Sequence, residues 1–140
     1  MKKFVAAVHM TRSYGFGHHS GWFWDPTWKA NLHILWPVSG KQVEQYIKRN
    51  FGFKYEWVGD PAARCIEIWS KGVGAHLICL NSWKESPKHY GILAHEAFHA
   101  THQILKERGV RLTDDSDEAF TYLLESIVDR CLQIMMNEPR

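Results

Sequence analysis

The sequence predicts one α+β domain, because short strand-like segments dominate the chain as far as Asn81 and two long helices follow. A length of 140 residues fits a single domain spanning residues 1–140 and leaves little room for a second. Hydrophobic residues make up 45% of the chain and charged residues 23%, which is typical of a globular protein with a packed core. We expect a small mixed or antiparallel sheet followed by the two helices.

Five short runs have the composition or alternation of strands. The second-to-last of them, Arg64–Trp69, alternates so that Ile66 and Ile68 face one side and Cys65, Glu67 and Trp69 the other. The last run is nearly continuous apolar sequence. Residues 11–28 mix Gly, Pro and aromatic residues, which suits an irregular loop or hairpin better than a helix. The five predicted strands are Phe4–Val8, Ala30–Trp36, Phe53–Val58, Arg64–Trp69 and Ala75–Asn81.

A first helix is predicted from Gly40 to about Asn50. Ser39 is a suitable N-cap, and Gly52 lies just beyond the expected C-terminal end. The apolar stripe that should face the core consists of Val43, Tyr46 and Ile47.

The two long helices are predicted near the C-terminus. One opens at Ser86-Pro87, runs from about Lys88 to Arg108 and stops at Gly109. The other runs from about Ser116 to Met136, and the aspartates near its start complement the helix dipole.

Composition argues against several kinds of partner. The net charge is only +2 and the basic residues are scattered, whereas nucleic-acid binding calls for a concentrated basic stripe. Three cysteines without a CxxC pair indicate reduced thiols in a cytoplasmic protein. No apolar run approaches the length of a membrane span, and the apolar stretch after Met1 stops at His9, too early for a signal peptide. We expect a cytoplasmic protein that binds neither nucleic acid nor membrane.

The segment His95-Glu96-Ala97-Phe98-His99 carries the HExxH pattern inside the first long helix. Residues four apart lie on one helix face, so His95 and His99 can bind the same metal ion. Zinc accepts histidine nitrogen, and a catalytic zinc keeps one coordination position for water. Glu96 is displaced around the helix and can take a proton from that water. Flanking apolar residues place the motif on the inward side of the helix in this interpretation.

A third ligand is expected from the last helix. Glu118 follows His99 by nineteen residues and lies in the predicted first turn. The turn at Arg108-Gly109-Val110 allows this helix to fold back on the first. Asp114 and Asp115 are rival ligands. His102 shares the face of the two histidines but lies two turns from His95, which favours a solvated or supporting role.

HExxH followed at this distance by a Glu within Asp117-Glu118-Ala119 resembles the gluzincin zinc metallopeptidases. The resemblance covers about Ala75 to Tyr122. It implies a zincin-like fold, with His95, His99 and Glu118 as ligands of one zinc ion per chain and Glu96 as the general base. It also implies that the strand Ala75–Asn81 is the sheet edge along which an extended substrate lies.

The chain departs from the larger members of that family at two points. Tyr122 stands where thermolysin-type sequences have an Asp that supports a zinc-binding His. Larger members take an oxyanion-stabilising His or Tyr from a later domain, so here we expect that group to come from the N-terminal part, from Tyr90, Tyr122 or His76, or from a partner. The chain resembles the compact minigluzincins, and more loosely the small HExxH proteins of phage and mobile elements.

The sequence thus predicts a zinc-dependent peptidase that acts on a protein or peptide substrate through metal-activated water. The alternative is a zinc-containing binding module, or a phage assembly protein, without peptidase activity. Glu96 separates the two, since a purely structural zinc site needs no free carboxylate beside the metal. Neither the natural substrate nor the oligomeric state follows from the sequence. His18 and His19, in the Gly- and Trp-rich loop, are expected to be part of an exposed loop, and the alternative is that they line a cleft.

Overall fold

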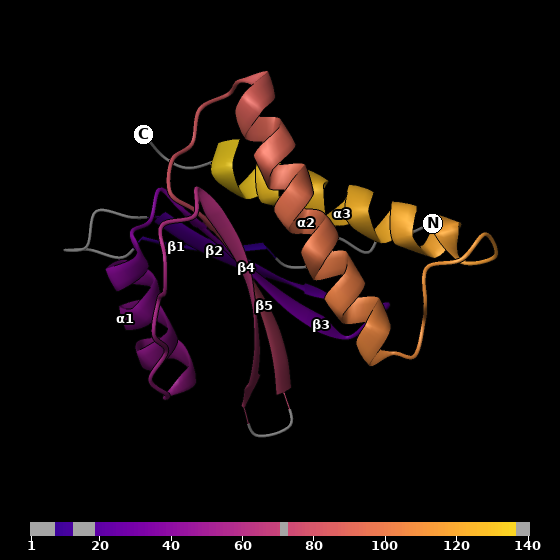
Figure 1. Ribbon diagram of the computed structural model, residues 1–140, viewed down its shortest axis with the longest axis horizontal. Helices are drawn as coiled ribbons and strands as arrows, with labels where there is room; N and C mark the ends of the chain where they lie inside the picture. The colour runs from indigo at the N-terminus through magenta and orange to yellow at the C-terminus, as the bar shows by residue number, and fades with distance from the viewer. Residues whose placement is uncertain (1–7, 13–18, 71–72, 137–140) are drawn as a thin grey trace.

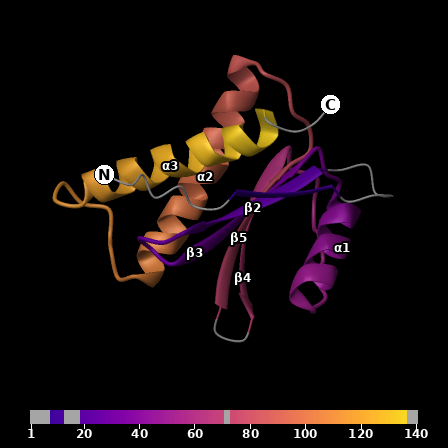
Figure 2. The same cartoon turned by 180° about the vertical axis from the view of Figure 1, so that it is seen from behind.

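A five-stranded sheet separates one helix from a pair of helices in the computed structural model (Figure 1). The structure describes residues 8–12, 19–70 and 73–136. Most of the predicted strand Phe4–Val8, and His18, lie outside these ranges. The view from behind shows the same two layers around the sheet, with α1 alone on one side (Figure 2). The mixed α+β class predicted from sequence is confirmed.

The strands follow the order β1-β2-β3-β5-β4 across the sheet. All neighbours are antiparallel except β3 and β5, which run parallel. A parallel pair needs a crossover connection, and the chain between β3 and β5 supplies α1 and β4. The strands are β1 Val8–Arg12, β2 His19–Asp25, β3 Ala30–Trp36, β4 Ala63–Ser70 and β5 Val73–Leu80.

The prediction that Ala75–Asn81 forms the sheet edge is wrong. This segment is β5, which pairs with β3 on one side and β4 on the other. Its residues from Ala75 to Leu80 are all buried. A strand covered on both faces by helices needs such a continuous apolar run, so the run itself was a signal of an interior position. The edges of the described sheet are β1 and β4, and β4 is the edge strand that contacts α2.

The alternating segment Phe53–Val58 is not a strand in the structure, contrary to prediction. Phe53, Tyr55 and Trp57 are half-buried and pack against the core below α1. Their alternation therefore reflects one-sided burial of an extended loop without a strand partner. The backbone N–H of Trp57 donates to Glu44 of α1 at 2.8 Å, which satisfies this group without a sheet ladder.

Helix α1 spans Gly40–Phe51, as the sequence predicts. Ser39 and Gln42 form a capping box, in which each side chain accepts from the other residue's backbone N–H. Gly52 ends the helix in the left-handed conformation, with φ of 78°. The predicted apolar stripe Val43, Tyr46 and Ile47 is buried against the sheet.

Helix α2 spans Pro87–Glu107 and α3 spans Asp117–Met136, both within two residues of the predicted bounds. Ser86 caps α2 by accepting from the backbone N–H of His89. The two helices cross on the sheet face opposite α1 (Figure 1). They enclose the larger of two cores, which includes Ile34, Ile78, Leu93, Ala97, Ile104, Leu123 and Ile127.

No helix within the described ranges combines the length and the apolar character needed to cross a membrane.

Candidate metal centre

Helix α2 presents His95 and His99 to solvent, and the expectation that they face inward is wrong. Residues two apart on an α-helix differ by about 200° around its axis. Ala97 points into the core and is fully buried, so His95 and His99 lie on the opposite side of the helix. The apolar neighbours of the motif in sequence do pack inward, but they occupy the other face.

The two imidazoles lie against each other, with ring centroids 4.9 Å apart. Their Nε2 atoms are 3.2 Å apart. Two nitrogens bound to one tetrahedral zinc at about 2.0–2.1 Å would be roughly 3.3 Å apart, so the pair fits the spacing of two zinc ligands. Without metal, the same spacing allows one ring to donate an N–H hydrogen bond to the other.

Of the three fixed residues of the HExxH pattern, Glu96 is the buried one, with 7% of its surface exposed. Burial raises the pKa of its carboxyl, while His95, His99, and a hydrogen bond from the backbone of Cys65 oppose that shift. Cys65 belongs to the edge strand β4. Glu96 therefore lies between the helix and the sheet edge, beside the two histidines, with a raised proton affinity that suits a general base.

An open groove of about 420 Å³ runs beside this carboxylate. One wall is the start of β4, with Ala62 and Ala63, and the other is α2. The helix contributes Lys88, Gly91, Ile92, His95 and Glu96. Ala62 and Ala63 have small side chains and Gly91 has none, so little side-chain bulk fills this part of the groove. This wall could not be predicted from the sequence, because the resemblance to gluzincins placed the sheet edge at the neighbouring strand Ala75–Asn81.

Glu118 lies in the first turn of α3, as predicted, and it is exposed. Within the described residues, no three His, Cys, Asp or Glu side chains gather as a metal site, so the structure does not bring Glu118 together with His95 and His99. The start of α3 nonetheless lies close to the motif. The ring of Phe120 is 6.5 Å from Phe98 and 6.4 Å from His102.

The other candidate residues occupy separate places. His102 is exposed and stacks on Phe98 at 6.5 Å, and Asp114 and Asp115 are exposed ahead of α3. Tyr122 is 68% exposed on α3, and Tyr90 is 37% exposed at the start of α2. His76 is fully buried on β5 beside Gln103 and Glu107, toward the C-terminal end of α2. His19 begins β2 and packs 5.6 Å from Trp36.

Comparisons with protein-family models, with curated proteins and with solved structures found no match for this chain. The assignment of function therefore depends on the geometry of these side chains.

Proposed function

We propose that the chain binds one zinc ion through His95 and His99, with Glu118 as the third ligand, and hydrolyses peptide bonds. The observation that carries this proposal is the 3.2 Å spacing of the two Nε2 atoms, with the carboxylate of Glu96 beside them. The spacing suits two of the four ligands of a tetrahedral zinc ion. Glu96 lies beside these two ligands, where its carboxylate would act on a metal-bound water rather than bind the metal.

Bound zinc lowers the pKa of a coordinated water to near 7 and polarises a substrate carbonyl. Glu96 supplies the other half of the chemistry. Its carboxylate accepts the proton of the attacking water and passes it to the departing amine. Burial of Glu96 supports both steps, because it raises the pKa of the carboxyl. A raised pKa brings accepting the proton and releasing it closer together in free energy.

The groove beside β4 is the substrate site in this proposal. Among the described strands, β4 pairs only with β5, so the other side of β4 is an open edge. An extended peptide can pair with such an edge through main-chain hydrogen bonds. A peptide lying along Ala62 and Ala63 would pass His95 and Glu96, which line the same groove.

The third ligand is the part of the proposal that requires movement. Phe120, two residues after Glu118, already packs against Phe98 and His102 on α2. Glu118 is thus about half a helical turn from a side chain that contacts the neighbours of the histidine pair on α2. Reorientation of this first turn, together with the exposed Glu118 side chain, would complete a gluzincin-like ligand set.

The alternative function is a zinc-containing binding module, or a phage assembly module, without peptidase activity. The separation of Glu118 from His95 and His99 favours it, because two histidines alone do not make the three-ligand catalytic site. Metal content and peptidase activity must therefore be measured separately.

Elemental analysis of protein purified without chelator tests the metal site. We expect about one zinc per chain, since the two histidines and one carboxylate form an open catalytic ligand set. The double variant His95→Ala, His99→Ala should lose the zinc while keeping the fold, because both side chains are exposed. His102→Ala is the matched control and should retain the zinc ion. Wild-type protein that neither contains nor takes up zinc would contradict the proposal.

A further inference from the structure

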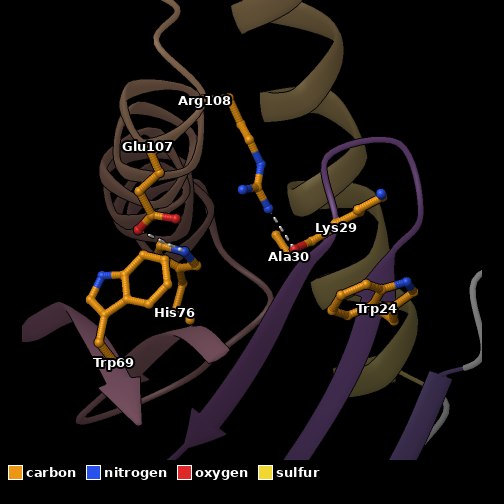
Figure 3. Close-up of a pocket in the computed structure, with 8 residues that line it drawn as sticks. Trp24, Lys29, Ala30, Trp69, His76, Glu107 and Arg108 are labelled. Atoms are coloured by element: carbon orange, nitrogen blue, oxygen red, sulfur yellow. Dashed lines mark hydrogen bonds and ion pairs between the residues drawn. The ribbon is translucent and has the colours of Figure 1, made fainter. Parts of the chain in front are cut away.

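A second cavity, of about 240 Å³, opens at the C-terminal end of α2 (Figure 3). Four elements meet there: β2, the turn before β3, the β4–β5 hairpin and the last turn of α2. The indoles of Trp24 and Trp69 stand on opposite sides, with Glu107 and Arg108 reaching in from the helix (Figure 3). The lining residues are Trp24, Lys29, Ala30, Trp69, Gly74, His76, Glu107 and Arg108.

Two hydrogen-bond acceptors converge in this cavity without a donor between them. His76 Nε2 and Glu107 Oε1 are 3.6 Å apart, too far for a good hydrogen bond. Oε1 of Glu107 is buried and has no hydrogen-bond partner among the described residues. A buried oxygen of this kind costs free energy until a donor reaches it.

The surroundings of His76 leave its Nε2 without a proton. Nδ1 lies 2.8 Å from Oε1 of Gln103, which accepts the Nδ1–H. The thiol of Cys65 also donates to this oxygen, which supports its assignment as the acceptor. Burial lowers the pKa of His76, so the ring is neutral near pH 7 and Nε2 presents a lone pair.

Glu107 is also neutral at that pH. Burial and a hydrogen bond with Glu67 raise its pKa to about 8. The same hydrogen bond lowers the pKa of Glu67, whose carboxylate also accepts from the indole N–H of Trp69 at 2.7 Å. The oxygen that faces His76 is therefore a carbonyl-type acceptor, and the cavity wall carries no free carboxylate at that point.

The Trp69 indole has a fixed orientation and an exposed ring face. Its hydrogen bond to Glu67 sets the ring orientation, and the ring lies over Gly74, its cross-strand partner. A Cβ at Gly74 would come within 3.1 Å of the ring, so glycine allows this close approach. Trp69 is 53% exposed and Trp24 40% exposed, so both offer apolar surface to the cavity.

Arg108 completes the lining with a positive charge. Its Nε and Nη2 donate to the carbonyls of Trp28 and Lys29, each at 2.9 Å. These two bonds fix the guanidinium beside the turn that precedes β3. They leave Nη1 as a donor for an occupant of the cavity.

We propose that this cavity binds a saccharide ring, with hydroxyl groups donating to His76 Nε2 and Glu107 Oε1 and the ring seated between Trp24 and Trp69. Hydroxyls both donate and accept, so a sugar satisfies the two bare acceptors and the free nitrogen of Arg108 together. The apolar C–H faces of a sugar ring suit the exposed indoles. An ammonium ligand would meet the charge of Arg108, and a carboxylate ligand would find no donor at His76 and Glu107.

The proposed saccharide site is separate from the metal centre. Glu107 follows His99 by eight residues, about 12 Å along the axis of α2. Its residues take no part in the proposed zinc chemistry, so the two proposals can fail independently. Loss of His95 and His99 should leave saccharide binding unchanged.

Saturation-transfer NMR and tryptophan fluorescence with a panel of saccharides test the proposal. The panel contains glucose, galactose, mannose, N-acetylglucosamine and their common disaccharides. We expect saturable binding of at least one of them. Trp69→Ala should weaken this binding about tenfold through the loss of a stacking surface. Trp83→Ala, which removes an indole outside the cavity, is the matched control and should leave the affinity unchanged.

Glu107→Leu removes the acceptor from within the cavity and should weaken binding at least about tenfold, with the fold checked by circular dichroism. This second variant keeps the test valid if Trp69→Ala loosens the β4–β5 hairpin. Absence of binding across the panel would overturn the proposal. So would saccharide binding that neither variant changes, or binding of choline in place of every saccharide, which would identify a cation site.

Discussion

Glu96 and its two histidine neighbours differ in burial although they share one turn of helix. The histidines are exposed, whereas Glu96 faces the edge strand and has little contact with water. In the proposed function, metal binding would belong to the exposed histidines and proton transfer to the buried Glu96. The histidine nitrogens remain available to a metal ion, and the carboxylate lies in surroundings that raise its pKa.

Glu96→Gln should abolish peptide hydrolysis and leave zinc binding intact. Glutamine keeps the shape of the side chain but accepts no proton, so kcat/KM should fall at least about 100-fold. Elemental analysis measures the zinc content, and cleavage of a peptide library measures hydrolysis. Glu125→Gln, an exposed change on α3, is the control for general effects of losing a carboxylate. Equal cleavage by wild type and Glu96→Gln would point to a contaminant or another mechanism.

Glu118→Ala should weaken zinc affinity strongly, whereas Asp115→Ala should change it little. The reason is position: Glu118 is in the first turn of α3, whose Phe120 packs on α2 beside the histidine pair. Competition with a chromophoric chelator measures both affinities. If instead Asp115→Ala or Asp114→Ala released the metal, the ligand assignment would be wrong.

Helix α2 owes its position to small residues on its inner face. Ala97 and Ala100 are fully buried, which lets the helix backbone approach the sheet closely. Glu96 reaches the backbone of Cys65 on β4 because of this close approach. The spacing between α2 and β4 therefore positions Glu96 beside the sheet edge, in the wall of the groove.

Ala100→Leu should therefore destabilise the protein by about 1–3 kcal/mol, as overpacking of a filled core does. It should also reduce peptide hydrolysis, because α2 is pushed away from β4. Urea unfolding gives the free energy of unfolding. Lys106→Leu places the same side chain on an exposed position of α2 and should have little effect. Full stability in Ala100→Leu would mean that the helix and sheet are not in close contact.

At the scale of the whole molecule, buried histidine links stability to pH. His33 is 7% exposed between the sheet and α1, and burial lowers its pKa to about 4. Its Nδ1 is 2.6 Å from the hydroxyl of Tyr46, and its Nε2 has no partner among the described residues. Between pH 4 and 6.5 the unfolded chain binds a proton at this site that the folded chain does not.

The free energy of unfolding should consequently rise with pH over that window. Because the unfolded chain binds the proton more tightly, the free energy of unfolding should be about 3 kcal/mol lower at pH 4 than at pH 7. His33→Asn removes the titration. The free energy of unfolding of wild type and variant, measured in parallel from pH 4 to pH 7, should converge as the pH falls. Parallel curves would show that His33 protonates in the folded protein as easily as in the unfolded chain.

Local patterns in the sequence were sufficient for most elements. Helix α1, with Ser39 as its N-cap and Gly52 beyond its end, matches the prediction closely, and so does strand β3. Caps, turns and apolar stripes depend on interactions over a few residues. The HExxH spacing likewise predicted that two imidazoles share a helix face, since helical geometry alone requires it. The segment Phe53–Val58 alternates between apolar and polar residues as a strand does, but it is not a strand. Strand formation needs a neighbouring strand to pair with, and this segment has none among the described residues.

Only the tertiary structure decided which strand lies at the sheet edge, which face of α2 is open, and which distant residues meet. The sequence by itself determined the mixed α+β class and the facing histidines, both of which follow from interactions between near neighbours. His76 and Glu107, by contrast, are 31 positions apart and meet only because β5 lies beneath the end of α2. Contacts of this kind depend on how whole helices and strands pack together, and no short sequence pattern predicts that packing.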